Sequence, residues 1–406
     1  MNRSSHQEET GGLVKANDFY ARLIAEHSTD SIVVTDREGL TVWCNLAFTK
    51  MSGFVMHEMQ GKTPGSVLQG PATDPATVMS IRNALYERRE IRTEIVNYSK
   101  SGSAYWIEIR ITPIFDEEGV HTHFMSIERD VTERKDLQAR LELAYRQLKQ
   151  DLEAAGVVQE ALLPRSSQIE NVEFVGHHEP SHFVAGDTYD VLRCPSGRIG
   201  FFMIDVAGHG AAAALVSVAA HQVVAQAILQ RENTEPLTET ANKINGRWQS
   251  HLPFFTMVLG EIDPVSGTGT LVQAGHPCPV LLRSSGAVLS LGPGGLPVGV
   301  LPSPSYQETA FGFSPGDKLL IYSDGFTDTE NAEGNAFSEQ RLHGLLQDDA
   351  RLPTAELMED IIRELRVWQG STKLQDDVTV LILEASSTLD ESTGRRHDSP
   401  VDGEAA

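Results

Sequence analysis

The chain of 406 residues contains few cysteines and few basic residues. Its three cysteines, Cys44, Cys194 and Cys278, are too scattered for a disulfide framework, and no two of them have the spacing of a zinc site. Scarce cysteine is typical of a reducing compartment, so we expect a cytoplasmic location. With 33 basic against 56 acidic residues, the net charge of -23 repels nucleic-acid phosphates and anionic lipid headgroups. We expect neither nucleic acid nor membrane as a partner.

Long apolar runs are also missing. No segment approaches the roughly 18 consecutive apolar residues of a membrane span, and residues 1–13 contain no apolar signal-peptide core. The length favours two or three domains. Residues 1–16 and 386–406 are polar and charged without apolar periodicity, which predicts that both ends are disordered.

Residues 17–132 have the pattern of a small α+β domain. Short apolar runs flank the turn signals Asp36-Arg37-Glu38-Gly39, Ser99-Lys100-Ser101-Gly102 and Asp116-Glu117-Glu118-Gly119. Strands that pair around such turns predict an antiparallel sheet of about five strands.

Residues 133–165 change to helix formers and predict a helical linker. Leu137, Leu141, Ala144 and Leu148 are spaced by four, three and four residues, as on the seam of a coiled coil. Two interpretations remain open. One is a parallel coiled coil that makes a homodimer and transmits a signal; the other is a lone amphipathic helix, because Asp151 falls on the next seam position.

Residues 166–385 contain many strand-like segments separated by glycine-rich turns. The clearest are Ile199–Ile204, Phe254–Ile262, Thr268–Gln273, Val280–Leu282, Lys318–Tyr322 and Val378–Leu383. Two helical stretches, Gly210–Gln230 and Ala355–Gln369, interrupt them. Many strands with few helices predict a sandwich of two sheets covered by helices.

Four aspartates stand at expected strand ends or turns, namely Asp187, Asp205, Asp324 and Asp376. Rigidly held carboxylates suit the hard cations Mg²⁺ and Mn²⁺. Two such cations about 3.5 to 4 Å apart can hold a hydroxide and polarise a phosphoryl group. Each aspartate alone is more often an ordinary turn residue, and the composition does not reveal whether the four converge.

Several motifs follow one another in a recognisable order. They are Gly186-Asp187-Thr188-Tyr189-Asp190, Asp205-Val206-Ala207-Gly208-His209-Gly210, Ala274-Gly275-His276-Pro277, Ser323-Asp324-Gly325 and Asp376-Asp377-Val378-Thr379. Together with Gln159-Glu160-Ala161-Leu162-Leu163-Pro164 and Gly295-Leu296-Pro297-Val298-Gly299, they resemble the PPM metal-dependent phosphatases. More narrowly, they resemble the bacterial sporulation stage II protein E branch. The resemblance covers about residues 157–383 and implies an α/β/β/α sandwich.

The resemblance also implies a site for two Mn²⁺ or Mg²⁺ ions. Asp205 would bridge both ions and the Val206 carbonyl would help to bind one. The remaining ligands would be Asp187, Asp324 and Asp376, with weaker claims for Asp377 and Asp190. Ala185 replaces a glycine that is usual in the branch, but this change removes no ligand.

Two histidines in these motifs are candidates for other roles. His209 either positions phosphate or protonates the leaving serine oxygen, or it is a helix-entry histidine held by hydrogen bonds. We expect His276, within its Gly-His-Pro turn, to pack or to hydrogen-bond.

The N-terminal region resembles a PAS domain in three segments, Val42-Trp43-Cys44-Asn45-Leu46-Ala47-Phe48, Asn97-Tyr98-Ser99-Lys100-Ser101-Gly102 and Arg129-Asp130-Val131-Thr132-Glu133-Arg134. Gly61-Lys62-Thr63-Pro64-Gly65 and Leu68-Gln69-Gly70-Pro71 resemble its flavin-binding, light-sensing branch.

The residues that carry the light chemistry of that branch are absent. Its photoreactive cysteine falls around Pro64 or Gly65, its second flavin-contacting asparagine around Ile107 and its glutamine around Glu128. No flavin-cysteinyl adduct can form at that position, and Cys44, in a different strand, is expected to serve packing. Asn97 alone is weak support for flavin. We expect a different, unidentified small ligand or sensing through partners and dimer contacts.

The leading hypothesis is a serine/threonine phosphatase controlled by the PAS domain through the linker helix. In relatives with sensor domains the usual substrate is a phosphorylated anti-sigma-factor antagonist, so the resemblance implies partner switching of a sigma factor. A histidine kinase is disfavoured, because residues 133–164 contain no phosphoacceptor histidine and no glycine-rich ATP lid follows. A regulatory scaffold with a non-catalytic phosphatase fold predicts missing carboxylates, yet all four aspartates are present.

Overall fold

The computed structural model describes residues 19–164, 166–232, 234–248, 251–371 and 373–386. The segments predicted to be disordered, 1–16 and 386–406, lie outside the described residues except for Ser386. The chain divides into two compact units, Met1–Arg146 and Gln147–Ala406.

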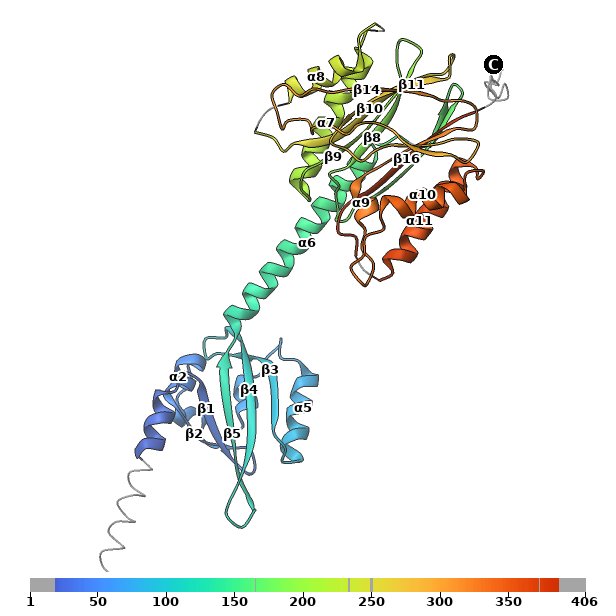
Figure 1. Cartoon of the computed structure of the whole chain (residues 1–406). Helices are drawn as coiled ribbons and strands as arrows, with labels where there is room; N and C mark the ends of the chain where they lie inside the picture. Colours follow the sequence, from blue (N-terminus) through green and yellow to red (C-terminus); the bar gives the residue numbers. More distant parts are fainter. Residues whose placement is uncertain (1–18, 165, 233, 249–250, 372, 387–406) are drawn as a thin grey trace, which may run out of the picture. The chain divides into compact units, whose positions relative to one another are not determined.

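The first unit contains the predicted antiparallel sheet, with strand order β2-β1-β5-β4-β3 (Figure 1). Its strands are β1 (Ser31–Asp36), β2 (Thr41–Cys44), β3 (Ile91–Tyr98), β4 (Ala104–Phe115) and β5 (His121–Asp130). Its helices are residues 19–27, α2 (Leu46–Ser52), α3 (Met56–Met59), α4 (Pro64–Leu68) and α5 (Pro75–Tyr86). The predicted number of strands is confirmed.

The sequence explains how this sheet is covered. Along β4 the side chains of Tyr105, Ile107, Ile109 and Ile111 alternate with exposed or half-buried residues and form one apolar cluster with α5. A second cluster around Phe48 joins β1 and β2 to α2, α3 and α4. The apolar interior of the unit is therefore divided between two clusters.

A single helix, α6 (Thr132–Glu160), follows the sheet and confirms the predicted helical linker. Its first turn is tied to the first unit, because Arg134 and Lys135 both pair with Glu94. Leu137, Leu141 and Leu148 are 57%, 71% and 57% exposed, so the apolar seam is unpartnered within the chain. The coiled coil and the homodimer remain predictions.

The second unit contains two antiparallel sheets. One has the order β14-β11-β10-β9-β8 and the other β13-β12-β15-β16-β7-β6. The strands are β6 (Ser167–Ile169), β7 (Val172–Glu179), β8 (Thr188–Arg193), β9 (Ile199–Val206), β10 (Phe255–Asp263), β11 (Thr268–Ala274), β12 (Val280–Leu282), β13 (Val288–Ser290), β14 (Glu308–Gly312), β15 (Lys318–Tyr322) and β16 (Val378–Ala385). The helices are α7 (Ala211–Leu229), α8 (Leu237–Arg247), α9 (Asp324–Asp328), α10 (Glu339–Asp348) and α11 (Thr354–Gln369).

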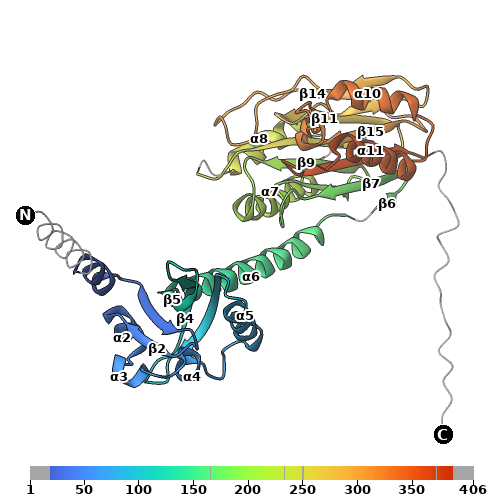
Figure 2. The same ribbon diagram turned by 90° about the horizontal axis from the view of Figure 1, so that it is seen from below.

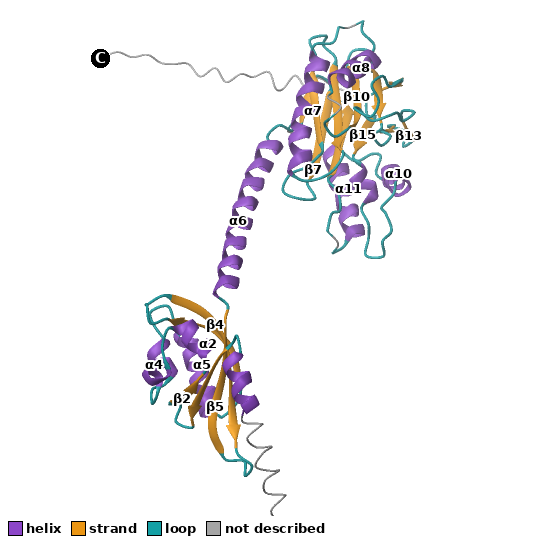
Figure 3. Cartoon of the chain, turned by 90° about the vertical axis from the view of Figure 1, so that its left-hand side faces the viewer, coloured by secondary structure: helices purple, strands orange, loops and turns teal. Residues whose placement is uncertain are grey.

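Three apolar clusters show that these elements form four layers. One cluster fills the space between the two sheets, a second joins α7 and α8 to the five-stranded sheet, and a third joins α10 and α11 to the six-stranded sheet. Figures 2 and 3 show the helices on the two outer faces. The predicted α/β/β/α sandwich is confirmed. The expectation of two helices was incomplete, because α8 and α10 have polar sequences with only a narrow apolar stripe.

Helix α7 is the one described helix long and apolar enough, by length and composition alone, to cross a membrane. Ser217, His221, Gln222 and Gln226 interrupt its apolar run. Its inward side chains, such as Val224, belong to the cluster that covers the five-stranded sheet. The apolar character of α7 is therefore accounted for in part by core packing.

Candidate active site

Asp187 and Asp205 form the inner part of a carboxylate cluster. Asp205 lies near the end of β9, and Asp187 lies in the turn that leads into β8, its neighbour in the sheet. The two carboxyl groups lie close enough for each to influence the pKa of the other. Asp187 is buried, and its Oδ2 also accepts a hydrogen bond from Thr379 Oγ1 at 2.6 Å. The five-stranded sheet therefore presents two carboxylates at one edge.

Asp324 and Asp376 form the outer part of the same cluster and come from the six-stranded sheet. Asp324 begins α9 directly after β15, and Asp376 precedes β16, which pairs with β15. Both aspartates reach solvent. The two sheets thus bring four carboxylates from distant parts of the sequence to one place, with an open side formed by Asp324 and Asp376.

The electrostatics of the cluster are unfavourable without a cation. Burial, followed by the nearby carboxylates of Asp324 and Asp376, raises the pKa of Asp205 to about 7. Burial and Asp205 raise the pKa of Asp187 well above its usual range. The pKa values of Asp324 and Asp376 are also raised, first by burial and then by neighbouring carboxylates. Like charges that raise one another's pKa values favour either protonation or a bound cation.

The donor set fits divalent metal ions, because these side chains supply only oxygen atoms and a negative charge that no described basic residue neutralises by an ion pair. The Val206 carbonyl oxygen lies beside Gly186, the residue before Asp187, since a Cβ at Gly186 would lie 3.0 Å from it. Within the described residues, however, no three ligand side chains already form a compact metal-binding group.

Asp377 has a different position from its neighbour Asp376. Its Oδ1 accepts hydrogen bonds from the backbone N–H and the hydroxyl of Ser181, and its Oδ2 accepts one from the Gly186 N–H at 2.7 Å. These bonds hold the loop that ends at Asp187. We interpret Asp377 as the residue that positions this loop, a role that its place in the motif does not reveal.

Replacing Asp377 by asparagine tests this interpretation. The amide would turn an N–H donor toward Ser181 or Gly186, so we expect a loss of about 1.5 to 3 kcal/mol in the free energy of unfolding, measured by urea denaturation. The exposed carboxylate of Asp348 supplies the matched control, Asp348→Asn. Unchanged stability with a loss of Mn²⁺ affinity would instead identify Asp377 as a metal ligand.

Asp190, the other weaker candidate, does not join the cluster through any described contact. Its Oδ2 lies 3.3 Å from His221 Nε2, and the other ring nitrogen of His221 contacts Thr188 Oγ1 at 2.9 Å. Both side chains are buried between β8 and α7. Asp190 therefore ties α7 to the sheet.

His209 lies in the turn before α7, flanked by Gly208 and Gly210, both with positive φ. Its exposed ring stacks on His182, with ring centroids 5.5 Å apart and ring planes 11° apart. His209 is close enough to Asp376 to offset a small part of the rise in that carboxyl's pKa, which burial dominates. The motifs did not indicate His182, because its position beside the site depends on the folding of the loop before Asp187.

His276 is buried, and its Nδ1 lies 2.8 Å from Thr256 Oγ1. Burial lowers the pKa of His276 to about 3, so the ring is neutral. These contacts agree with the packing and hydrogen-bonding role expected for this histidine.

Comparison with known families and structures supports the two parts of the chain separately. The sequence profile of stage II sporulation protein E (SpoIIE) matches residues 195–386, and that of the PAS domain matches residues 29–133. The solved SiaA-PP2C domain of Pseudomonas aeruginosa has a TM-score of 0.53 and 22% sequence identity; the match covers 59% of this chain and 98% of that domain. At this identity the likeness supports the fold alone.

Curated relatives match the PAS part. A blue-light-activated histidine kinase of Brucella ovis is 34% identical over 125 residues, which are 30% of this chain and 25% of that protein. A kinase with the same description from Rhizobium johnstonii is 34% identical over 122 residues, 29% of this chain and 35% of that protein. The chain thus spans about a quarter of the first relative and about a third of the second.

The phosphatase fold, the aspartate motifs and the SpoIIE match together confirm the resemblance stated from the sequence. PPM phosphatases of this kind depend on divalent metal ions. The chain therefore combines an N-terminal PAS domain with a C-terminal domain of the stage II sporulation protein E family, a PPM-type protein serine/threonine phosphatase.

Proposed function

We propose that the protein removes phosphate from serine or threonine of a small regulatory protein, under control of its PAS domain. The proposed boundaries are residues 17–132 for the PAS domain, 133–165 for the linker and 166–385 for the phosphatase domain. The observation that carries the proposal is the convergence of Asp187, Asp205, Asp324 and Asp376 at one open edge. A homodimer in the cytoplasm is part of the same proposal.

The residues have distinct proposed roles. Asp205 would bridge two ions, Mn²⁺ or Mg²⁺, with the Val206 carbonyl and the other three aspartates as further ligands. Such ions neutralise the carboxylates, activate water and polarise the phosphoryl group. Because Asp324 and Asp376 are exposed to solvent, a phosphate attached to a protein surface would approach the ions from this side. His209, exposed beside Asp376, would orient that phosphate or protonate the departing serine oxygen.

The proposed substrate class is a phosphorylated anti-sigma-factor antagonist, as implied by the SpoIIE family. The test is to incubate the purified full chain and Mn²⁺ or Mg²⁺ with p-nitrophenyl phosphate and with phosphorylated antagonist proteins. We expect metal-dependent hydrolysis of both and its loss in Asp324→Ala. Metal-independent hydrolysis, or equal rates in Asp324→Ala, would contradict the metal site. Metal binding without hydrolysis would favour a regulatory scaffold.

The end of the linker helix contacts the loop that carries Asp187, which gives the PAS domain a route to the site. The Gln159 side chain donates to the Ala185 carbonyl at 2.7 Å and accepts from the Ala185 N–H at 3.0 Å. It also donates to the Ser217 hydroxyl of α7 at 2.8 Å. Movement of α6 would therefore displace the residue two positions before Asp187.

Replacing Gly156 by alanine is expected to lower the phosphatase rate although it favours helix formation. A Cβ at Gly156 would lie 2.4 Å from the Phe183 carbonyl oxygen, so the helix and the Asp187 loop must separate. A shift of this kind lowers rates by roughly 10- to 100-fold, measured with p-nitrophenyl phosphate at saturating Mn²⁺.

Gly344→Ala in α10 is the matched control, because a Cβ there meets no atom within 4 Å. It should raise the free energy of unfolding by about 1 kcal/mol and leave the rate unchanged. If Gly156→Ala retained the full rate, contact between α6 and the Asp187 loop would be unimportant for activity.

A further inference from the structure

The PAS domain contains a cavity of about 460 Å³ between its two apolar clusters. The wall on one side includes Val33 and Leu68, and the wall on the other includes Ile95, Ile109 and Phe124. This volume lies within the range of small-molecule sites, about 300 to 1,000 Å³. A ligand with an apolar body would join the two clusters into one continuous core.

The buried end of the cavity presents a carboxyl group. Glu128 is 1% exposed, and its only described partners are two hydroxyls. Ser31 Oγ donates to one of its oxygens at 3.1 Å and Ser126 Oγ donates to the other at 3.2 Å. Each carboxylate oxygen can accept a second hydrogen bond. Glu128 therefore has acceptor capacity left for a donor inside the cavity.

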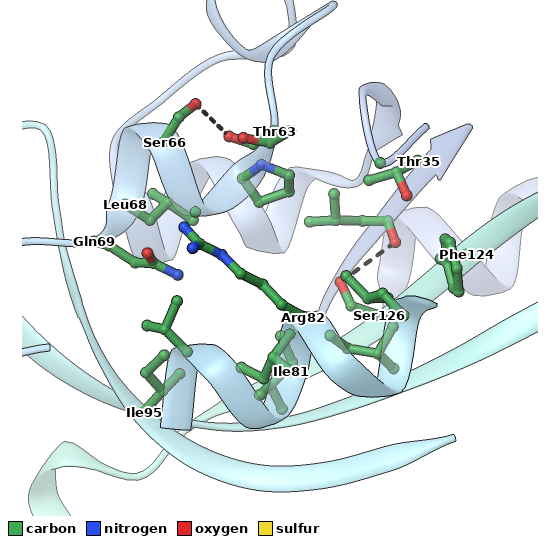
Figure 4. A pocket seen from close by; sticks show the side chains of 18 of the residues that line it. Thr35, Thr63, Ser66, Leu68, Gln69, Ile81, Arg82, Ile95, Phe124 and Ser126 are labelled. Carbon is green, nitrogen blue, oxygen red and sulfur yellow. Dashed lines mark hydrogen bonds between the residues drawn. The ribbon is translucent and has the colours of Figure 1, made fainter. Parts of the chain in front are cut away.

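The solvent-exposed side of the cavity presents a cation. Arg82 of α5 lines the cavity, and no described residue forms an ion pair or hydrogen bond with it. Figure 4 shows its side chain extending toward Gln69. Glu38, the remaining charged residue of the lining, is exposed and pairs with Arg37. An unpaired guanidinium is suited to binding a carboxylate or phosphate in two-point contact.

We propose that the cavity binds a small heteroaromatic anion whose ring N–H donates to Glu128 and whose carboxylate or phosphate pairs with Arg82. The flat ring fits between the aliphatic side chains, and a single N–H needs only one acceptor at the buried end. This inference concerns the PAS domain and does not depend on the proposed phosphatase activity.

Glu128 also argues against flavin as the ligand. A flavin presents a carbonyl on each side of its ring N–H, and both carbonyls require donors. Glu128 offers acceptor oxygens when ionised and Ile107 offers no donor, so Asn97 is the one of these three positions that retains an amide donor. The Cys44 thiol cannot supply adduct chemistry either, because burial and then Glu128 raise its pKa to about 11. The proposed ligand therefore presents N–H donors at the buried end without adjacent carbonyls.

A fatty acid fits less well, because its alkyl chain would cover Glu128 without donating to it. A long-chain amino acid would place three ammonium donors where few acceptors are available. The probes chosen for the test below distinguish these two ligand classes from the proposed heteroaromatic anion.

The test is calorimetric titration of the full chain with five probes. Indole-3-acetate carries both the N–H and the anion, indole lacks the anion, and 1-naphthylacetate lacks the N–H. The other two are 6-aminohexanoate and flavin mononucleotide. We expect indole-3-acetate to bind about tenfold more tightly than indole and than 1-naphthylacetate, since each charge-assisted hydrogen bond contributes that factor or more.

Two variants assign the contacts. Arg82→Gln should lower the affinity for indole-3-acetate about tenfold and leave the affinity for indole unchanged. Glu128→Gln should lower the affinity for both of these probes but leave the affinity for 1-naphthylacetate unchanged. Arg88→Gln is the matched control, because Arg88 is exposed beyond the end of α5 and does not line the cavity. The proposal is overturned by equal affinities for indole-3-acetate and 1-naphthylacetate, by tightest binding of flavin mononucleotide or 6-aminohexanoate, or by no binding of any probe at millimolar concentration.

Discussion

Replacing Asp205 by asparagine is expected to reduce the phosphatase rate by roughly 1000-fold, because the proposed bridging carboxylate is lost. The same change should stabilise the metal-free protein. Burial and the surrounding carboxylates raise the pKa of Asp205 to about 7 from its usual 3.8. The folded state then binds more protons than the unfolded state between these values, so stability falls as the pH rises from about 4 to 7. Asparagine removes this penalty.

Thermal unfolding at pH 7.5, in EDTA and in Mn²⁺, measures both consequences. Wild type should be less stable than Asp205→Asn in EDTA but should gain more stability from Mn²⁺, since a ligand of the folded state stabilises it. The control Asp348→Asn removes an exposed carboxylate of α10 and should behave as wild type in both conditions. An Asp205→Asn protein with the wild-type response to Mn²⁺ would exclude Asp205 as a metal ligand.

The sequence motifs predicted the members of this cluster better than their individual roles. Asp187, Asp205, Asp324 and Asp376 stand at sheet edges that the two-sheet fold brings together, so a family resemblance was enough to group them. Whether an adjacent carboxylate points into the cluster depends on strand pairing and on loop donors that lie far apart in sequence. Asp377, held by the Ser181 loop 196 positions away, is one example.

Contacts between residues far apart in the sequence also limited the prediction of secondary structure. The long apolar strands β9, β10 and β16 were predicted close to their bounds, whereas β7 and β8 were not. Those two strands carry polar residues such as His178 and Asp190, whose side chains find buried partners only in the folded domain. A pattern based on alternating hydrophobicity does not detect strands of that kind.

In the PAS domain the sequence indicated which chemistry is missing, and the structure indicates what replaces it. The absence of a cysteine at Pro64 or Gly65 excluded the photochemical adduct. The presence of a cavity with Arg82 at one end could not be predicted from residue spacing, because its walls come from six separate elements. Glu128 stands where the light-sensing branch has a glutamine, and it therefore puts an ionisable group at the other end of the cavity.

Replacing Glu128 by glutamine is expected to stabilise the ligand-free PAS domain by up to about 3 kcal/mol above pH 7. Burial raises the pKa of Glu128 to about 7 from its usual 4.5, opposed only by the hydroxyls of Ser31 and Ser126. The folded state therefore retains a proton that the unfolded state releases between pH 4.5 and 7. Wild-type stability should decline across that interval and remain low above it, whereas the glutamine variant should show no such decline.

Hydrogen exchange of the backbone amides of β1 and β5, corrected for intrinsic rates, measures this effect within the intact chain because Glu128 lies on β5 opposite Ser31 of β1. Glu118→Gln in the exposed turn before β5 is the control and should leave the profile unchanged. If wild type and Glu128→Gln had parallel profiles from pH 4.5 to 7.5, Glu128 would not change its protonation on unfolding in that interval. If the expected profile is found, addition of indole-3-acetate should restore stability to wild type but not to Glu128→Gln. The same carboxylate would then weaken the empty domain and strengthen the liganded one.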